Sequence, residues 1–197
     1  WLDIDIQKLN LVNEEFYKKS NNPGYKSDLA RYEILNKYGG IYIDTDFECL
    51  KQIPKELLNY DFLSCIIFDK EPIIANGMMM ATPNCHFLEK TICSIKRQET
   101  NDINEIMRIA GPHHLTKNYF GLSEKEKEEI LILPSNYFYP FPNFELGKEI
   151  QIKNQITNVS IAIHHWEMSW MKRNILLRII KKIIKISSNL KIFFFKN

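Results

Sequence analysis

The chain has 197 residues, 45% hydrophobic and 25% charged, a balance typical of one globular domain with a sizeable core. Its four cysteines, Cys49, Cys65, Cys85 and Cys93, lack the spacing of a zinc or redox site and the density of a disulfide-stapled protein, so we expect free thiols in a reducing compartment. The net charge of +2 conceals an acidic body, with 18 basic and 24 acidic residues up to position 170, and a basic tail.

The first clear element is a helix predicted over residues 27–38. Ser27 can cap its start, Asp28 suits the positive end of the helix dipole, and Gly39 and Gly40 supply its stop. We therefore expect the chain to turn sharply after residue 38.

A short buried strand is predicted directly after this turn. Residues 41–43 are β-branched or aromatic and run straight into Asp44 and Asp46. The order helix, turn, strand and acidic loop is typical of an α/β protein.

Further strands and helices are predicted along the rest of the chain. Strands are predicted over 61–68, 73–80, 130–133 and 159–163, a helix over 87–96, a capping box from Ser123 to Glu126, and a loop packed by its own aromatic side chains over 134–142. Strands that alternate with helices favour a mostly parallel sheet covered on both faces.

Asp44 and Asp46 are the first candidates for chemistry. Carboxylates at positions i and i+2 of an extended chain point to the same side, so both can face one divalent cation. Open α/β sheets also bind their ligands at the carboxyl ends of the strands. Taken alone, however, the three letters of this motif more often mark two solvated loop acids.

The wider segment 27–46 is more specific. It reads S-D-x-x-R followed by Y-G-G-I-Y-I-D-T-D, and it resembles the D-x-D sugar-transferase region of glycosyltransferase family 32. That family includes capsule and lipopolysaccharide sugar transferases and yeast initiating mannosyltransferases, and the clostridial glucosylating toxins share its core.

The resemblance implies a GT-A-type sheet that binds a nucleotide sugar, retention of the sugar's configuration, and a Mn²⁺ or Mg²⁺ ion on the diphosphate. It implies that Asp28 and Arg31 hold the donor sugar and phosphate, that Tyr42 lines the nucleotide site, that Asp44 contacts ribose and metal, and that Asp46 is the principal metal ligand. Two alternatives stay open: an ordinary surface ion pair between Asp28 and Arg31, and core packing of Tyr42.

The cluster His164-His165-Trp166-Glu167-Met168-Ser169-Trp170 resembles the family's C-terminal end, where a histidine completes the metal shell. Strand alternation sends His164 and His165 to opposite faces, so at most one is a ligand; the residues leave the choice open, and we assign His165. Trp170 is expected to cap the donor, with a core or membrane-interface position as the alternative.

Two other segments resemble family positions near the donor. Asn76 and Gly77 match a site beside the reacting sugar, with a plain turn as an equal alternative. In Gly111-Pro112-His113-His114, His113 is a candidate phosphate or acceptor contact, whereas His114 is expected to be exposed after a helix stop.

The start of the chain departs from the family pattern. Family members usually have two strands before the matched segment, so we expect the sheet to lack its first strands. Trp1 matches an aromatic residue that stacks on the donor base. We assign residues 1–170 to the transferase domain.

Residues 171–197 form the basic tail, with eight Lys or Arg and no acid. Within 171–186, isoleucine and leucine recur at helical spacing between the basic residues, which predicts an amphipathic helix on an anionic membrane surface. Packing of that helix on the protein's own core is the alternative, and nucleic acid is not expected as a partner. Without a signal peptide or an apolar run of about 20 residues, we expect a cytoplasmic protein attached peripherally to the membrane.

These features predict a metal-dependent hexosyltransferase that uses a UDP- or GDP-sugar and a glycan or glycolipid acceptor in polysaccharide biosynthesis. Two alternatives use the same residues: a non-catalytic membrane-associated interaction domain with a degenerate transferase fold, and a metal-dependent phosphohydrolase with water as acceptor.

Overall fold

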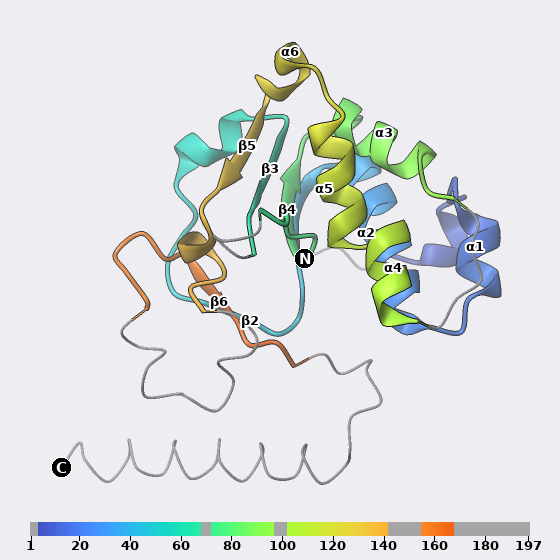
Figure 1. The fold of residues 1–197 in the computed structure, drawn as a ribbon, viewed down its shortest axis with the longest axis horizontal. Helices are drawn as coiled ribbons and strands as arrows, with labels where there is room; N and C mark the ends of the chain where they lie inside the picture. The colour runs from blue at the N-terminus through green and yellow to red at the C-terminus, as the bar shows by residue number, and fades with distance from the viewer. Residues whose placement is uncertain (1–3, 68–71, 97–101, 142–154, 168–197) are drawn as a thin grey trace, which may run out of the picture.

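The computed structural model describes residues 4–67, 72–96, 102–141 and 155–167, which form a mixed α/β structure (Figure 1). The helices are α1 (Glu14–Lys19), α2 (Pro23–Tyr38), α3 (His86–Cys93), α4 (Ile103–Ile109), α5 (Pro112–Phe120) and α6 (Glu124–Lys127). The strands are β1 (Gly40–Ile43), β2 (Phe47–Cys49), β3 (Phe62–Cys65), β4 (Met78–Ala81), β5 (Ile130–Leu133) and β6 (Ala162–His164). Three short 3-10 turns are η1 (Ile6–Lys8), η2 (Lys55–Asn59) and η3 (Ser135–Tyr137).

The main sheet is mixed, which corrects the prediction of a mostly parallel one. Its strand order is β1-β4-β3-β5, and β4 runs antiparallel to both of its neighbours while β3 and β5 are parallel. The reason lies in the connections. The segment between β3 and β4 contains the bridge Ile66–Ile74 and no helix among its described residues, so the chain folds back as a hairpin. Helices α3 to α6 separate β3 from β5 and allow a parallel crossover.

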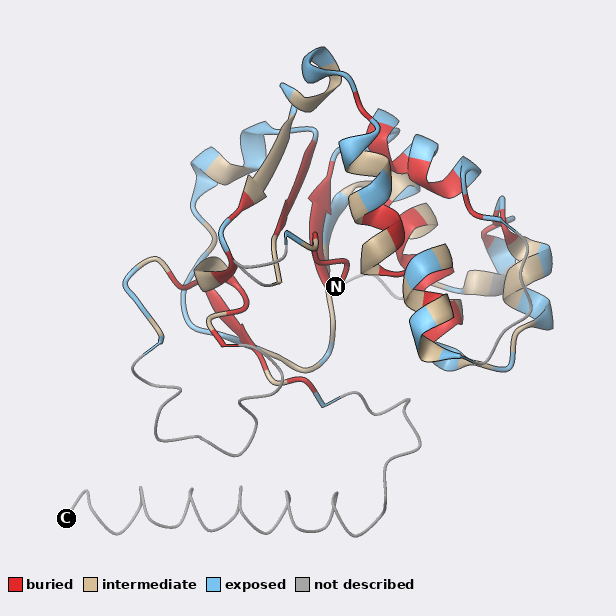
Figure 2. Ribbon diagram, viewed as in Figure 1, coloured by how far each residue is buried: buried red, intermediate tan, exposed pale blue. Residues whose placement is uncertain are grey.

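Two apolar cores lie against the two faces of this sheet. Successive side chains of a strand point to opposite faces, so Met79 joins one core and Met78 and Met80 join the other. The first core packs against α2, α3 and α5, and the second against β6 and the aromatic residues that follow β5. Figure 2 shows the buried central strands between these layers.

Strands β2 and β6 form a separate antiparallel ribbon, in which Phe47 pairs with His164. The sequence pattern predicted β6 about one to three residues too early and gave no signal for β2. This ribbon is what brings the C-terminal histidine segment next to the acidic loop between β1 and β2.

Helix α2 begins earlier than predicted. Pro23 occupies its first turn, and the side chain of Asn22 accepts hydrogen bonds from the backbone N–H groups of Gly24 and Tyr25. Ser27 therefore lies inside the helix and does not cap it. The stop is as predicted, because Gly39 adopts φ +66° and its Cβ, if present, would lie 2.7 Å from Pro83.

Strand β1 is at the edge of the sheet and is not the buried strand that its residues predicted. It has only β4 as a described neighbour, and Ile41 is 49% exposed. The other local predictions agree better with the structure. The helix predicted over 87–96 is α3, although it ends at Cys93, and the capping box at Ser123 and the strand over 130–133 are confirmed. In the loop after β5, Phe138, Tyr139 and Phe141 are buried, as predicted for its aromatic residues.

None of the described helices combines the length and the apolar character needed to cross a membrane. The predicted amphipathic helix over 171–186, Trp1 and Trp170 lie outside the described residues.

Candidate functional site

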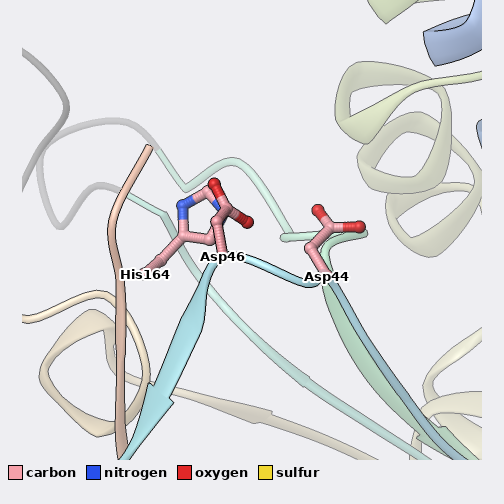
Figure 3. Close-up of side chains that lie close together, drawn as sticks. All are labelled: Asp44, Asp46 and His164. Atoms are coloured by element: carbon pink, nitrogen blue, oxygen red, sulfur yellow. The ribbon is translucent and has the colours of Figure 1, made fainter. Parts of the chain in front are cut away.

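The site is built around Asp44 and Asp46, which follow the end of β1 and precede β2. One ligand atom from each of Asp44, Asp46 and His164 lies within 4.8 Å of the other two. Figure 3 shows the three side chains gathered where β1 ends, β2 begins and β6 ends. Two carboxylates and an imidazole are a suitable donor set for one divalent cation.

The third member of this group is His164, which corrects our choice of His165. His164 Nε2 lies 3.0 Å from Asp46 Oδ1, and its side chain is on the inner face of β6 opposite Phe47. The next residue points to the other face, where His165 Nε2 lies 2.9 Å from Glu48 Oε2 and the side chain is 37% exposed. The alternation itself was predicted correctly; the pattern could not show which histidine faces inward.

Several groups fix the position of Asp46. Its Oδ1 faces His164, its Oδ2 accepts a 2.8 Å hydrogen bond from the backbone N–H of Glu167, and its carbonyl accepts one from the N–H of His165. Trp166 adopts φ +53° between these residues, a conformation that bulky side chains rarely take. Burial acts to raise the pKa of Asp46, but the hydrogen bonds from His164 and Glu167 outweigh it and hold that pKa below its usual value.

A different set of contacts fixes the position of Asp44. Its Oδ1 accepts a 2.6 Å hydrogen bond from the Tyr42 hydroxyl and lies 3.4 Å from Arg31 Nη1, and its backbone N–H donates to Gly77 O. Burial raises the pKa of Tyr42, and the ring of Tyr42 lies 4.7 Å from the guanidinium carbon of Arg31. Tyr42 is therefore joined to Asp44 and Arg31 and is not simply a core residue.

Helix α2 contributes a buried charged pair behind Asp44. Arg31 Nη2 lies 3.3 Å from Asp28 Oδ1, which also accepts a 2.9 Å hydrogen bond from Asn76 Nδ2. Arg31 Nη1 donates to the carbonyl of Asn76 at 2.7 Å. Both charged side chains are buried, which rules out a solvated surface ion pair. Asn76 thus has a structural role in the network, beyond any plain turn.

The charges of this pair are set by burial and by each other. Burial raises the pKa of Asp28 to about 6, although the positive charge of Arg31 acts in the opposite direction. For Arg31, burial acts to lower the pKa, but the carboxylates of Asp28 and Asp44 and the nearby tyrosines outweigh it, so the guanidinium stays charged.

The backbone of Gly77 lies close to the side chains of Asp44 and Tyr139, as expected of a glycine beside a site. A Cβ at this position would lie 2.5 Å from Asp44 Oδ2 and 2.9 Å from the hydroxyl of Tyr139. Tyr139 was not among the predicted site residues. It is buried, and its pKa is raised by burial and by the nearby Cys65, Asp44 and Asp46. Its only sequence signal was the aromatic run between prolines after β5.

The second histidine segment is not part of this site as described. Gly111 precedes α5, and the expected exposure of His114 is wrong, because His114 is buried with Nε2 3.0 Å from the carbonyl of Thr91. The proposed role of His113 in phosphate or acceptor binding stays a prediction.

Comparisons with known proteins agree with the resemblance seen in the sequence. A family model described as "Glycosyltransferase sugar-binding region containing DXD motif" matches residues 2–63. Inositol phosphoceramide mannosyltransferase 1 of Schizosaccharomyces pombe is 30% identical over 60% of this chain and 37% of its own length. Lactosylceramide 4-alpha-galactosyltransferase of Mus musculus is 30% identical over 71% of this chain and 40% of its own length.

A solved structure titled "PaToxG Glycosyltransferase" covers 76% of this chain and 50% of that chain, with a TM-score of 0.47 and 19% identity. The chain spans about two fifths of the two curated relatives named above. The predicted resemblance to the D-x-D sugar-transferase family is confirmed, and its named relatives are glycosyltransferases.

Proposed function

We propose that this chain is a metal-dependent, retaining glycosyltransferase that moves a hexose from a UDP- or GDP-sugar to a glycan or glycolipid in polysaccharide biosynthesis. One observation carries the proposal. The structure brings Asp44, Asp46 and His164 together beside the buried pair Asp28–Arg31, and four of these five residues belong to the segment that matches the sugar-transferase family.

Asp44, Asp46 and His164 are the residues that would hold the cation, Mn²⁺ or Mg²⁺. A bound cation would stabilise the charge that gathers on the departing nucleoside diphosphate, without any proton donor. The protein's own part is to keep the ligand atoms in place before the donor binds. The contacts of Asp46 with His164 and Glu167, and those of Asp44 with Tyr42 and Arg31, fix both carboxylates.

Asp28 and Arg31 are proposed to orient the donor. A carboxylate accepts hydrogen bonds from sugar hydroxyls, and a guanidinium donates to phosphate oxygens with defined geometry. Because Asn76 holds both residues through its side chain and its carbonyl, neither is free to turn away. Trp1 and Trp170 are proposed to contact the donor as well, on the family resemblance alone.

The names of the relatives support a lipid-linked acceptor. One relative is named for transfer of mannose to inositol phosphoceramide and the other for transfer of galactose to lactosylceramide. We propose a glycolipid or glycan acceptor at the cytoplasmic membrane face, reached by attachment through the tail.

The test is release of UDP or GDP from a panel of sugar nucleotides, with Mn²⁺, with Mg²⁺ or with a chelator. We expect release from one donor that needs metal and that is lost in Asp46→Ala. Glu56→Ala is the matched control, because it removes an exposed carboxylate of η2 outside the site, and it should behave as wild type.

A phosphohydrolase would release product equally fast without an acceptor glycan, whereas a transferase should be accelerated by one. A folded protein that neither binds a donor in the presence of metal nor releases product would contradict the proposal and favour the non-catalytic interaction domain.

A further inference from the structure

Three aromatic rings surround the imidazole of His164. The ring centroids of Trp166, Phe47 and Tyr139 lie 4.4, 4.6 and 5.1 Å from that of His164. The three residues come from different segments: Phe47 from β2, Tyr139 from the loop after β5, and Trp166 from the residues after β6. The imidazole is therefore enclosed from several parts of the chain.

The second nitrogen of this imidazole has no polar support. His164 Nε2 faces Asp46, whereas Nδ1 is buried and has no hydrogen-bond partner among the described residues. Histidines that bind metals usually donate a hydrogen bond from their other nitrogen to a carboxylate, a carbonyl or water, and this bond fixes the ring's orientation. Here the packing of the rings must supply that orientation instead.

Among these three rings, Tyr139 is the one that connects the surroundings of His164 with the Asp44 side of the site. Its ring also lies 5.4 Å from the rings of both Phe47 and Trp166. Its hydroxyl reaches the other side of the site, since a Cβ on Gly77 would meet both that hydroxyl and Asp44 Oδ2 within 3 Å. Trp166 is held in turn by its indole N–H, which donates to the carbonyl of Phe141.

We infer that Phe47, Tyr139 and Trp166 form an aromatic cage that positions His164 as a metal ligand, and that Tyr139 is its central positioning residue. This inference rests on the proposed function, because it needs a cation at Asp44, Asp46 and His164. The cage replaces the hydrogen-bonding partner that a histidine ligand usually has. Loss of the Tyr139 ring should therefore weaken metal binding, while loss of its hydroxyl alone should not.

The experiment is calorimetric titration of Mn²⁺ into the full chain without donor, so that the readout does not depend on activity. We expect Tyr139→Leu to raise the Kd for Mn²⁺ roughly 10- to 100-fold, the range known for residues that support a metal ligand. Tyr139→Phe keeps the ring and should bind Mn²⁺ close to wild type. Phe47→Leu removes another wall of the cage and should also weaken binding, which keeps the test usable if Tyr139→Leu does not fold.

Tyr119→Leu is the matched control. It removes a tyrosine ring that packs against Phe87 in the other core, and it should leave the Kd unchanged. Wild-type affinity in folded Tyr139→Leu and Phe47→Leu would overturn the cage. Equal losses of Mn²⁺ affinity in Tyr139→Phe and Tyr139→Leu would also overturn the cage, because they would show that the hydroxyl and not the ring of Tyr139 supports metal binding. Failure of the wild type to bind Mn²⁺, and Mg²⁺ in a parallel titration, would instead overturn the metal site of the proposed function.

Discussion

At the scale of single residues, Gly77 lets the sheet approach the acidic loop. Its carbonyl accepts the hydrogen bond from the N–H of Asp44, and there is no room for a side chain, because a Cβ would lie 2.5 Å from Asp44 Oδ2. In Gly77→Ala, we expect Asp44 to be displaced by several tenths of an ångström or more. Misplacement of a site residue by about 1 Å can cost on the order of 100-fold in rate, and we expect kcat/KM to fall by that order.

Gly121→Ala is the control for this prediction. At the end of α5, a Cβ would meet its nearest atoms at 3.4 and 3.5 Å, which is ordinary contact. Steady-state kinetics with the sugar nucleotide that the donor panel selects, together with thermal melting of both variants, separate the effects on the site and on the fold. Activity of Gly77→Ala equal to that of Gly121→Ala would show that Asp44 tolerates the displacement.

Asp28 makes stability depend on pH. Its folded pKa of about 6 exceeds the ordinary 3.8, so the folded state holds this proton more tightly than the unfolded state does. The cost of ionising Asp28 is absent below pH 4, grows between pH 4 and 6, and is complete above pH 6. Two pKa units correspond to roughly 3 kcal/mol.

Asp28→Asn removes this titration. From pH 4 to pH 7, the free energy of unfolding of the wild type should fall relative to that of the variant by roughly 3 kcal/mol. Urea unfolding of both proteins across this range measures the difference. A difference that stays constant with pH would mean that Asp28 ionises in the fold as easily as in water.

At the scale of elements, the start of α2 decides where Asp28 and Arg31 lie. Asn22 caps the helix through two backbone N–H groups, and Asn22→Ala should lower the free energy of unfolding by about 1 kcal/mol. Asn22→Ser keeps an oxygen that can cap and should restore most of the loss. Urea unfolding checks this; equal stability of Asn22→Ala and wild type would show that the cap is unimportant.

The same helix shows what local sequence could and could not predict. Ser27 and Asn22 are both acceptable caps, and only the structure shows Ser27 Oγ accepting from Arg31 Nη2 inside the helix. The stop at Gly39, the capping box at Ser123 and the presence of helix α3 were predictable because each depends on neighbours within a few residues. The direction of β4 and the exposure of β1 depend on pairing between distant segments, which a periodic pattern does not encode.

The site divides in the same way. Asp28, Arg31, Asp44 and Asp46 were predictable because one continuous segment carries them. The inward histidine and the cage were not, because they require that β6 pair with β2 and that the loop after β5 fold over the ribbon. The signal that could have found Tyr139 is its place in a proline-bounded aromatic run, which predicted a packed loop but not a partner.

At the scale of the whole molecule, the site lies where separate parts of the chain meet. One side belongs to α2 and the main sheet, and the other to the ribbon of β2 and β6. The acidic loop between β1 and β2 is the shortest of the chain connections that join the two parts. Substitutions in the part with α2 and the main sheet should therefore affect the site by moving Asp44. Substitutions in the ribbon should affect it by moving Asp46.

The segregation of charge along the chain leads to the last prediction. Residues 171–197 carry eight basic residues against a net charge of −6 for the remainder, and their apolar residues recur at helical spacing. Each Lys or Arg near an anionic surface contributes about 1 kcal/mol, so the triple variant Lys181→Gln, Lys182→Gln, Lys185→Gln should weaken binding to phosphatidylserine vesicles on the order of 100-fold. Vesicle sedimentation at low and high salt measures this, and phosphatidylcholine vesicles should bind little in either case.

Removal of residues 171–197 distinguishes a tail that binds membranes from a helix that packs on the protein's own core. If the tail binds membranes, the shortened chain should lose vesicle binding and keep its melting temperature, because no core contact has been removed. If the tail covers the core, the shortened chain should melt at a lower temperature, and the triple variant should change vesicle binding little. The two outcomes exclude each other, since an apolar stripe buried against the protein cannot also insert into lipid.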